Sequence, residues 1–221
     1  MIEVTYVDHM GSDLSVVNSA RVSFGKKSEA LGEVGIGDDP VMVPVLHDND
    51  VRLIRYLAKH KHKSPFNHAF ATFHVKAPIF VARQLVKHEY MPWNEISRRY
   101  VDDEPEFYVP DVWRGRSADK KQGSEGVVDV GDWGDTNWAC LKAYNDLLEH
   151  GVAPEQARMV LPQSTMTEWY WSGSLFAFAK MCGLRLKDDT QYETRLVAQE
   201  IEDYMMDIYP NSWEALRMYD D

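Results

Sequence analysis

The spacing of apolar residues changes along this chain, and that change limits the fold more than any other feature. Ile2 to Asp8 alternates apolar and polar residues, as a strand with one buried face does. Phe70 to Lys76 also has the pattern of a strand. From Thr136 onward the apolar residues mostly recur at helical spacing. Strands early and helices late predict a mixed α/β (α+β) fold, with a mixed sheet packed against helices and a helical second half.

Capping residues, glycines and prolines locate the expected helices. We expect helices that begin at Ser12, Asp48 or Asn49, Pro78, Thr136, Pro154, Ser172 or Ser174, and Asp188. The expected ends are Pro92 for the third helix, Gly151, Pro162 and Gly183 for the next three, and Pro210 for the last.

Two segments are rich in glycine, proline or charged residues and predict loops. We expect loop excursions at 25–47, where Gly32, Gly35, Gly37, Pro40 and Pro44 lie, and at 113–135. The chain has no repeat of fixed period and no linker. We therefore expect a single domain over residues 1–221.

Charge and composition narrow the classes of partner. The formal net charge of −11 argues against a surface that binds the phosphate backbone of nucleic acids. A few arginines gathered in one cleft can still reverse the local field and hold a small anion. No stretch approaches the ~20 apolar residues that cross a bilayer. Met1 to Val4 has no basic region followed by an apolar run, so we expect no signal peptide. With only two cysteines, Cys140 and Cys182, we expect a cytoplasmic protein with no nucleic-acid or membrane partner.

The densest polar cluster runs from Arg83 to Glu89 and resumes from Asn94 to Tyr100. If residues 79–90 are helical, Gln84, Lys87 and His88 share one face of that helix. The fixed fork of arginine suits a phosphate, and an amide can read the edge of a base. The residues alone leave two interpretations open, a nucleotide site and a salt-bridged surface.

Histidines offer a second candidate site. His60 and His62 are two residues apart, and His68 and His74 follow. The first spacing can bind a metal, but no Asp or Cys stands at a familiar interval, so we expect no metal site.

Two arginines, Arg158 and Arg185, interrupt apolar stretches. A buried arginine needs a partner, so each is either half of a structural ion pair or a ligand contact, and the residues alone favour the ion pair.

Taken together, these clusters resemble the flavin-dependent thymidylate synthase (ThyX) family. The family signature is an Arg-His-Arg triplet, seven residues, a Ser and a later Arg-Tyr pair. Here the frame contains Lys87-His88-Glu89, seven residues, Ser97 and Arg99-Tyr100. Further matching segments follow in the family's order, at 19–24, 62–66, 72–84, 157–162 and 184–185. The resemblance covers most of the chain outside 25–47 and 113–135.

The resemblance implies a ThyX-type fold and the reductive methylation of dUMP to dTMP. Methylenetetrahydrofolate would donate the carbon, and FAD reduced by NADPH would donate the hydride. The active unit would be a homotetramer whose sites are shared between subunits. Neither cysteine would be catalytic.

The resemblance also implies the ligand contacts. The expected dUMP contacts are Gln84, Leu85, Val86, Lys87, Glu95, Ile96, Ser97, Arg98, Arg99, Arg158 and Arg185. Arg185 would act in catalysis by favouring ionisation of the uracil N3 position. The expected FAD contacts are Ser23, Ser64, Lys87, His88, Glu89, Glu95, Ser174 and Lys180, and His62 would lie on the folate and flavin side.

The chain departs from the family pattern at several of these positions. Lys87 and Glu89 replace the two arginines of the triplet, and Pro92 replaces a serine. Ser174 and Lys180 replace two asparagines on the flavin side, and we hypothesise that Lys180 restores the positive charge lost at Glu89. The altered triplet leaves open a related pyrimidine nucleotide, hydroxymethylation, or nucleotide binding without turnover. A metal-dependent hydrolase built on His60, His62 and His68 is a further alternative.

Overall fold

The computed structural model describes residues 1–36, 41–101, 103–119, 123–131 and 134–219. Gly37 and Pro40, which belong to the first expected loop, lie outside this part of the chain.

A four-stranded antiparallel sheet forms the centre of the structure, in the order β1-β4-β8-β5. Its strands are β1 (Glu3–Met10), β4 (Phe70–Pro78), β5 (Trp93–Glu95) and β8 (Met166–Ser174). The strands expected near the N-terminus and at Phe70 are therefore confirmed.

Strand β8 was not expected, although it lies between β4 and β5 in the sheet. Trp169 and Trp171 point into the core, at 1% and 0% exposure, whereas Tyr170 on the opposite face is exposed. Because the exposed position is also aromatic, the two-residue period looks like a continuous apolar run in the sequence. The mixed α/β fold is confirmed, but its second half contains this long strand.

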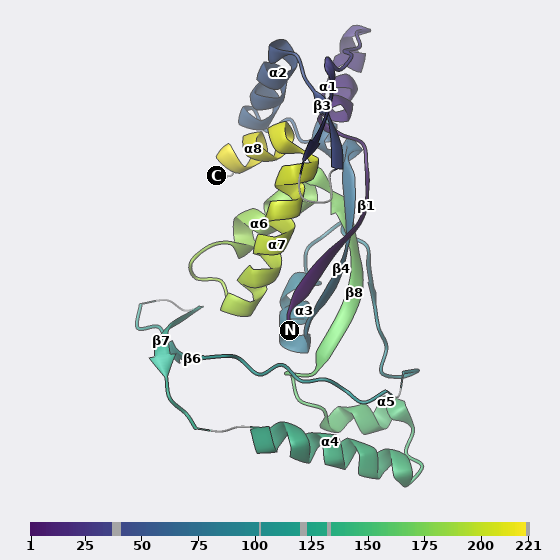
Figure 1. Cartoon of the computed structure of the whole chain (residues 1–221), viewed down its shortest axis with the longest axis vertical. Helices are drawn as coiled ribbons and strands as arrows, with labels where there is room; N and C mark the ends of the chain where they lie inside the picture. The colour runs from purple at the N-terminus through teal and green to yellow at the C-terminus, as the bar shows by residue number, and fades with distance from the viewer. Residues whose placement is uncertain (37–40, 102, 120–122, 132–133, 220–221) are drawn as a thin grey trace.

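Helices cover one face of the sheet (Figure 1). They are α3 (Ile79–Leu85), α6 (Leu175–Arg185), α7 (Tyr192–Ile208) and α8 (Pro210–Met218), with α1 (Asp13–Arg21) and α2 (Asp48–Lys59) at one end. In the core the ring of Phe178 on α6 meets Phe73 of β4 at 5.2 Å and Trp171 of β8 at 5.5 Å between centroids. The sheet and α6 therefore share one aromatic core.

The opposite end of the molecule holds α4 (Gly134–Glu149), α5 (Pro154–Ala157) and a hairpin of β6 (Trp113–Arg116) and β7 (Ser124–Val128) (Figure 1). A second hairpin joins β2 (Gly32–Ile36) to β3 (Val41–Val45). Short 3-10 helices complete the chain at η1 (Val22–Phe24), η2 (Ser64–His68) and η3 (Arg158–Val160).

The expectation of loops at 25–47 and 113–135 needs correction, because each segment contains a β-hairpin. Val43, 3% exposed, anchors β3 in an otherwise exposed pair of strands. Pro44 is tolerated because a two-stranded ribbon has free edges that need no N–H donor. The glycines of β2 and the arginines of β6 favoured a loop, and Pro44 interrupts the apolar run of β3, so pairing across each hairpin is what reveals these strands.

Most expected helices are confirmed, with shifted ends. Ser174 is the cap of α6, and its Oγ accepts a hydrogen bond from the N–H of Ala177 at 3.2 Å. α4 begins at Gly134, two residues before Thr136, and α7 begins four residues after Asp188. Pro210 opens α8, because proline fits the first turn of a helix as well as the position after one.

The third helix is shorter than expected and ends at Leu85, so residues 79–90 are not all helical. The next strand begins at Trp93 and must run back along β8, which leaves residues 86–92 to reverse the chain. Tyr90 takes a left-handed backbone conformation in this reversal, with φ of 60°. Tertiary pairing therefore ends the helix before Pro92 does.

Asp13 ties the first helix to the last. Its carboxylate is 1% exposed and accepts hydrogen bonds from the backbone N–H of Asn211 and Ser212 and from Asn211 Nδ2, each at 2.9 Å. These donors belong to the first turn of α8, where backbone N–H groups have no partner within the helix. A single buried carboxylate thus caps a helix 198 residues away in sequence.

Replacing Asp13 by Ala is expected to lower the free energy of unfolding by about 2–4 kcal/mol, because buried donors lose a charged acceptor. Asp13→Asn keeps one acceptor oxygen and should cost less. Urea unfolding followed by circular dichroism measures both, with the exposed helical residue changed in Asp146→Ala as control. A loss no larger than that of the control would contradict this role for Asp13.

Candidate functional site

An arginine-lined cleft of about 570 Å³ lies at the end of the sheet where β5 stops. After Glu95 the chain turns, because the carbonyl of Ser97 accepts from the N–H groups of Tyr100 at 3.0 Å and Val101 at 3.1 Å. This turn brings Arg98 and Arg99 to the cleft, which we call the arginine cleft. Its polar lining consists of Arg83, Glu95, Ser97, Arg98, Arg99, Arg158, Thr165 and Thr167.

The side chains of this cleft are partly held in place. Arg99 Nε donates to Ser97 Oγ at 3.3 Å, and Arg98 donates to the carbonyl of Asp103. Arg98 Nε is buried and has no hydrogen-bond partner among the described residues. A buried donor without a partner costs free energy, so it is an open position for an acceptor.

Glu95 is fixed by the sheet itself. Its Oε1 accepts from Thr167 Oγ1 at 2.7 Å, and its Oε2 accepts from Trp93 Nε1 at 3.2 Å. The Trp93 ring stacks on Trp169 of β8, with centroids 4.3 Å apart. The carboxylate is therefore oriented by two neighbouring strands before any ligand binds.

Arg185, at the end of α6, joins the altered triplet to α3. Its Nε donates to His88 Nε2 at 3.0 Å, and its Nη2 donates to the carbonyl of Gln84 at 2.8 Å. Neither contact is an ion pair, so the structural pair that the residues alone favoured is not what holds Arg185. Gln84, Lys87 and Arg185 all line one cleft although α3 stops short of Lys87.

His88 is neutral in this arrangement. Burial, the charge of Arg185 and the charge of Lys180 lower its pKa from 6.5 to about 4. Since Arg185 Nε–H points at Nε2, the proton of the neutral ring lies on Nδ1. A neutral His88 can accept from Arg185 without repelling it.

The cleft that holds Arg185 is closed on its outer side by the β6–β7 hairpin, and we call it the hairpin cleft. Its volume is about 740 Å³. The guanidinium of Arg114 lies 3.9 Å from the centroid of the Tyr192 ring, which fixes the hairpin to the start of α7. Burial and the neighbouring Glu193 raise the pKa of Tyr108 to about 12, so its hydroxyl stays protonated beside that carboxylate.

Two further hollows lie on either side of the segment 61–63. The larger, about 860 Å³, includes Ser23 and Ser64, and the smaller, about 260 Å³, includes Lys180. His62 lines both. We call them the large and small His62 hollows.

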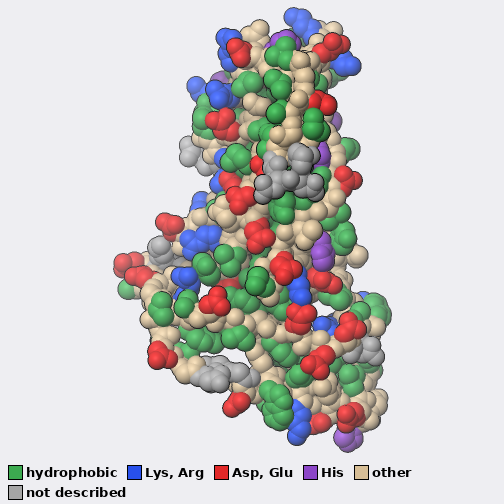
Figure 2. Space-filling model, viewed as in Figure 1, with side chains coloured by type: hydrophobic (Ala, Val, Ile, Leu, Met, Phe, Trp, Pro, Cys, Tyr) green, Lys and Arg blue, Asp and Glu red, His purple; other side chains and the backbone are tan. Residues whose placement is uncertain are grey.

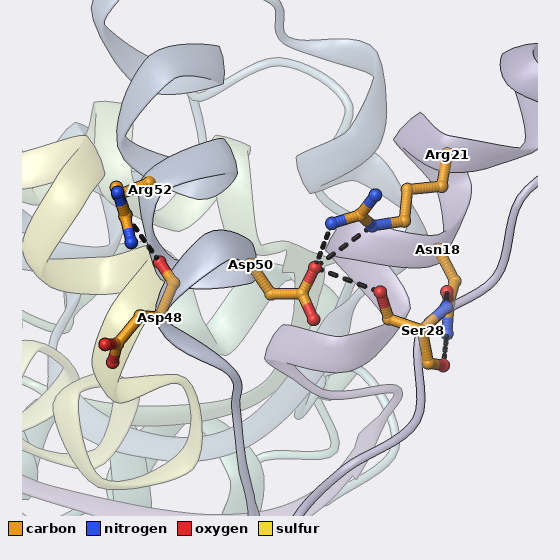
Figure 3. Close-up of polar contacts among 6 residues, drawn as sticks. All are labelled: Asn18, Arg21, Ser28, Asp48, Asp50 and Arg52. Atoms are coloured by element: carbon orange, nitrogen blue, oxygen red, sulfur yellow. Dashed lines mark hydrogen bonds and ion pairs between the residues drawn. The ribbon is translucent and has the colours of Figure 1, made fainter.

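A buried ion pair shapes the wall of the large His62 hollow. Asp50, on α2, accepts from Arg21 Nε and from Ser28 Oγ, each at 3.0 Å, and is paired with Arg21 Nη2 (Figure 3). Asn18 Oδ1 accepts from the N–H of Ser28 at 2.7 Å, and Asn18 Nδ2 donates to the carbonyl of Ser28 at 3.1 Å. These contacts anchor both ends of the loop that carries Ser23.

The expected ligand contacts are divided among these separate hollows of one chain. The arginine cleft is lined by Val86, Glu95, Ile96, Ser97, Arg98, Arg99 and Arg158 of the expected set, whereas the hairpin cleft is lined by Gln84, Lys87 and Arg185. Ser23, Ser64, His62 and Lys180 line the His62 hollows. Arg158 is exposed, its Nε donates to the carbonyl of Glu155 at 3.3 Å, and among the described residues it forms no structural ion pair.

Three of the residues expected to contact ligands lie elsewhere in the structure. The side chain of Leu85 is fully buried in the core, so only its backbone is available to a ligand. Ser174 is 6% exposed, caps α6 and donates to Asn67 Oδ1 at 2.7 Å. Glu89 is exposed on the loop after α3.

Residues of the hairpin cleft were missed by the sequence analysis. Tyr108, Arg114, Gln191 and Glu193 come from segments that the chain brings together only in three dimensions. No local pattern marks them, because each stands in an ordinary loop, strand or helix start.

The described residues contain no group of three or more His, Cys, Asp or Glu side chains placed to hold a metal ion. The rings of His60 and His62 instead surround Tyr56, with centroids 4.3 Å and 6.1 Å from it. Among the described helices, none has the length and apolarity needed to cross a membrane.

The pKa of His88 is testable by NMR titration of its ring, with an expected midpoint of about 4. As pH falls from 6.5 towards 4, the unfolded chain binds a proton at His88 before the folded chain does, so the free energy of unfolding falls across that window. Arg185→Gln removes a positive charge and should raise the midpoint. A midpoint of 6.5 in both proteins would contradict the arrangement.

Comparison with known proteins relates this chain to one family. A family model described as thymidylate synthase complementing protein matches residues 5–211. The flavin-dependent thymidylate synthase of Thermus thermophilus is 39% identical over 220 residues, which span 96% of this chain and 74% of the relative. That of Thermosipho africanus is 36% identical over 218 residues, 95% of this chain and 88% of the relative.

A solved structure agrees with the sequence comparisons. The UMP/dUMP methylase PolB from Streptomyces cacaoi, bound with 5-Br dUMP, superposes with a TM-score of 0.82 and 31% identity, over 100% of this chain and 96% of that one. The chain therefore belongs to the flavin-dependent thymidylate synthase family.

Proposed function

We propose that this protein methylates dUMP to dTMP, with a folate as carbon donor and a reduced flavin as hydride donor. The observation that carries the proposal is the arginine cleft, whose lining includes Arg98, Arg99, Arg158 and the hydroxyl-bearing Ser97. Three guanidinium groups and a hydroxyl in one hollow match a monophosphate, because arginine binds phosphate oxygens in pairs. These guanidinium groups are clustered although the chain as a whole has a net charge of −11, and an anionic ligand would offset their mutual repulsion.

Arg185 is the residue to which we assign the activation of uracil. Its guanidinium is held by His88 and by the carbonyl of Gln84, neither of which neutralises its charge. A fixed positive charge favours ionisation at uracil N3, and the resulting negative charge makes C5 a better nucleophile. No cysteine nucleophile is then needed.

The His62 hollows fit a flavin dinucleotide, which we propose to be FAD. The larger one offers the hydroxyls of Ser23 and Ser64, and Lys26 and Lys61 for a diphosphate. Tyr56, half-exposed on α2, supplies an aromatic face. NADPH would reduce the bound flavin, and the reduced flavin would donate the hydride to the nucleotide. The protein's part is to hold the reactants in line and to exclude water.

Lys180 supports the proposed compensation for Glu89. It lines the small His62 hollow and is close enough to His88 to lower the pKa of that ring. Helix α6 thus places a positive charge, that of Lys180, near the altered triplet.

We further propose that complete sites form between copies of the chain in a homotetramer. Arg158 and Arg185 both belong to the expected dUMP set, yet one chain places them in different clefts. A site built from two copies would bring the arginine cleft of one subunit to the hairpin cleft of another.

The first experiment is to record the visible absorption of the purified protein with and without FAD and dUMP. A flavin spectrum that shifts when dUMP is added is expected, followed by dTMP formation when NADPH and methylenetetrahydrofolate are supplied. Mass spectrometry separates methylation from hydroxymethylation, because a hydroxymethyl product retains an extra oxygen. A colourless protein that responds to neither ligand would overturn the proposal.

Lys180→Ala is expected to weaken FAD binding in the same titration, because the positive charge proposed to compensate for Glu89 is lost. Lys142→Ala on α4, far from the His62 hollows, is the matched control. Equal FAD affinity in the two variants would refute the compensation.

UMP is a second candidate acceptor, favoured by the solved relative that is described as a UMP/dUMP methylase. The ratio of kcat/KM for dUMP and UMP decides between a deoxynucleotide-specific enzyme and one that accepts both. A ratio near one would identify the broader activity.

Sharing of sites is tested by mixing two inactive variants, Arg158→Ala and Arg185→Ala, and refolding them together. If each site takes one arginine from each of two subunits, random assembly restores about a quarter of the sites. Recovered dTMP formation at roughly that level is expected. No recovery, with both variants folded and assembled, would place both arginines in a site from one chain.

A further inference from the structure

A basic rim surrounds the His62 hollows of this acidic protein. Between positions 52 and 63 the chain has five Lys or Arg residues and no Asp or Glu, although the whole chain has a net charge of −11. We define the basic rim as Lys26, Lys59, Lys61 and Lys63. Figure 2 shows Lys and Arg side chains gathered at the end of the molecule that holds α1 and α2.

The rim is built into the turn that follows α2. Lys61 has a left-handed backbone conformation, with φ of 55°, at this turn. Lys61 and Lys63 line both His62 hollows, and Lys26 joins them at the larger one. Lys63 Nζ also lies 5.4 Å from the centroid of the Phe176 ring, at the small hollow. Three of the four rim lysines therefore line the hollows on either side of His62.

The carboxylates of Asp50 and Glu214 are already bound by other residues. Asp50 is buried and held by Arg21 and Ser28, and Glu214 is paired with Arg55 at 3.2 Å. Among the described residues, Lys26, Lys59 and Lys63 form no ion pair. The local field at the rim is thus positive, against the sign of the whole molecule.

We propose that the basic rim binds the glutamate tail of the folate co-substrate and selects folates that carry several γ-linked glutamates. The inference rests on the proposed function, in which His62 lies on the folate side of the site. A tail that leaves a folate beside His62 must pass Lys61 and Lys63, and each added glutamate brings one more carboxylate. Lysines suit such a tail, because a flexible point charge follows an anion whose position varies.

The flavin diphosphate does not account for the whole rim. A diphosphate carries two negative charges, and the serine hydroxyls of the large hollow already offer it hydrogen bonds. Lys59, exposed at the end of α2, does not line either hollow, so it extends the positive surface outward from the site. An extended anion uses such a surface, whereas a compact one does not.

The test compares methylenetetrahydrofolate with one glutamate and with about five, at low salt and at about 0.5 M NaCl. We expect the longer tail to lower KM about tenfold at low salt, and the difference to disappear at high salt, where exposed charges are screened. The double variant Lys59→Gln/Lys63→Gln should lose this preference and keep the KM for the short folate. Lys142→Gln/Lys187→Gln, which removes the same charge elsewhere, should keep the preference.

Direct binding separates this inference from the proposed function. Calorimetry with a free oligomer of γ-linked glutamate measures the rim without turnover, and FAD affinity, measured in parallel, should be unchanged in the rim variant. Binding of the oligomer without dTMP formation would refute the synthase but support the rim. Turnover with equal KM for both folates would refute the rim alone. Equal competition by polyphosphate would show a non-specific charge effect and would also overturn the inference.

Discussion

The pairing of β8 between β4 and β5 is the constraint on which the rest of the structure depends. β8 aligns nine residues with β4, from Met166 opposite Pro78 to Ser174 opposite Phe70. Its inward tryptophans fill the aromatic core, and its last residue caps α6. The strand therefore sets where α6 starts, and consequently where Arg185 lies at the other end of that helix.

The same strand organises the arginine cleft. β5 is only three residues long, and its position follows from pairing with Trp169 to Trp171. That pairing ends α3 early, turns the chain at Ser97 and places Glu95 against Thr167. Binding residues on such a turn are held by the sheet, which limits the entropy that is lost when a ligand orders them.

Positively charged side chains gather in two places, although the net charge of the molecule is negative. Guanidinium groups gather in the arginine cleft and lysines around the His62 hollows, while the chain as a whole is strongly acidic. An acidic surface keeps polyanions such as nucleic acids away, and local positive fields admit small anions. This division of charge accords with the proposal of a nucleotide in the arginine cleft and a flavin and a folate at the His62 hollows.

The first strands, most helix starts and the family can be predicted from the sequence, because alternation, caps and motif spacing are local properties. The sequence also fixes which residue types are available, including the altered triplet Lys87-His88-Glu89 and Lys180. The three-dimensional fold was needed to show that β8 is a central strand, that α3 stops at Leu85 and that Arg185 binds His88 instead of a carboxylate. It also decided that Arg158 and Arg185 face different clefts of one chain. These outcomes depend on strand pairing and packing between segments far apart in sequence, and no local pattern encodes which distant partner a residue meets.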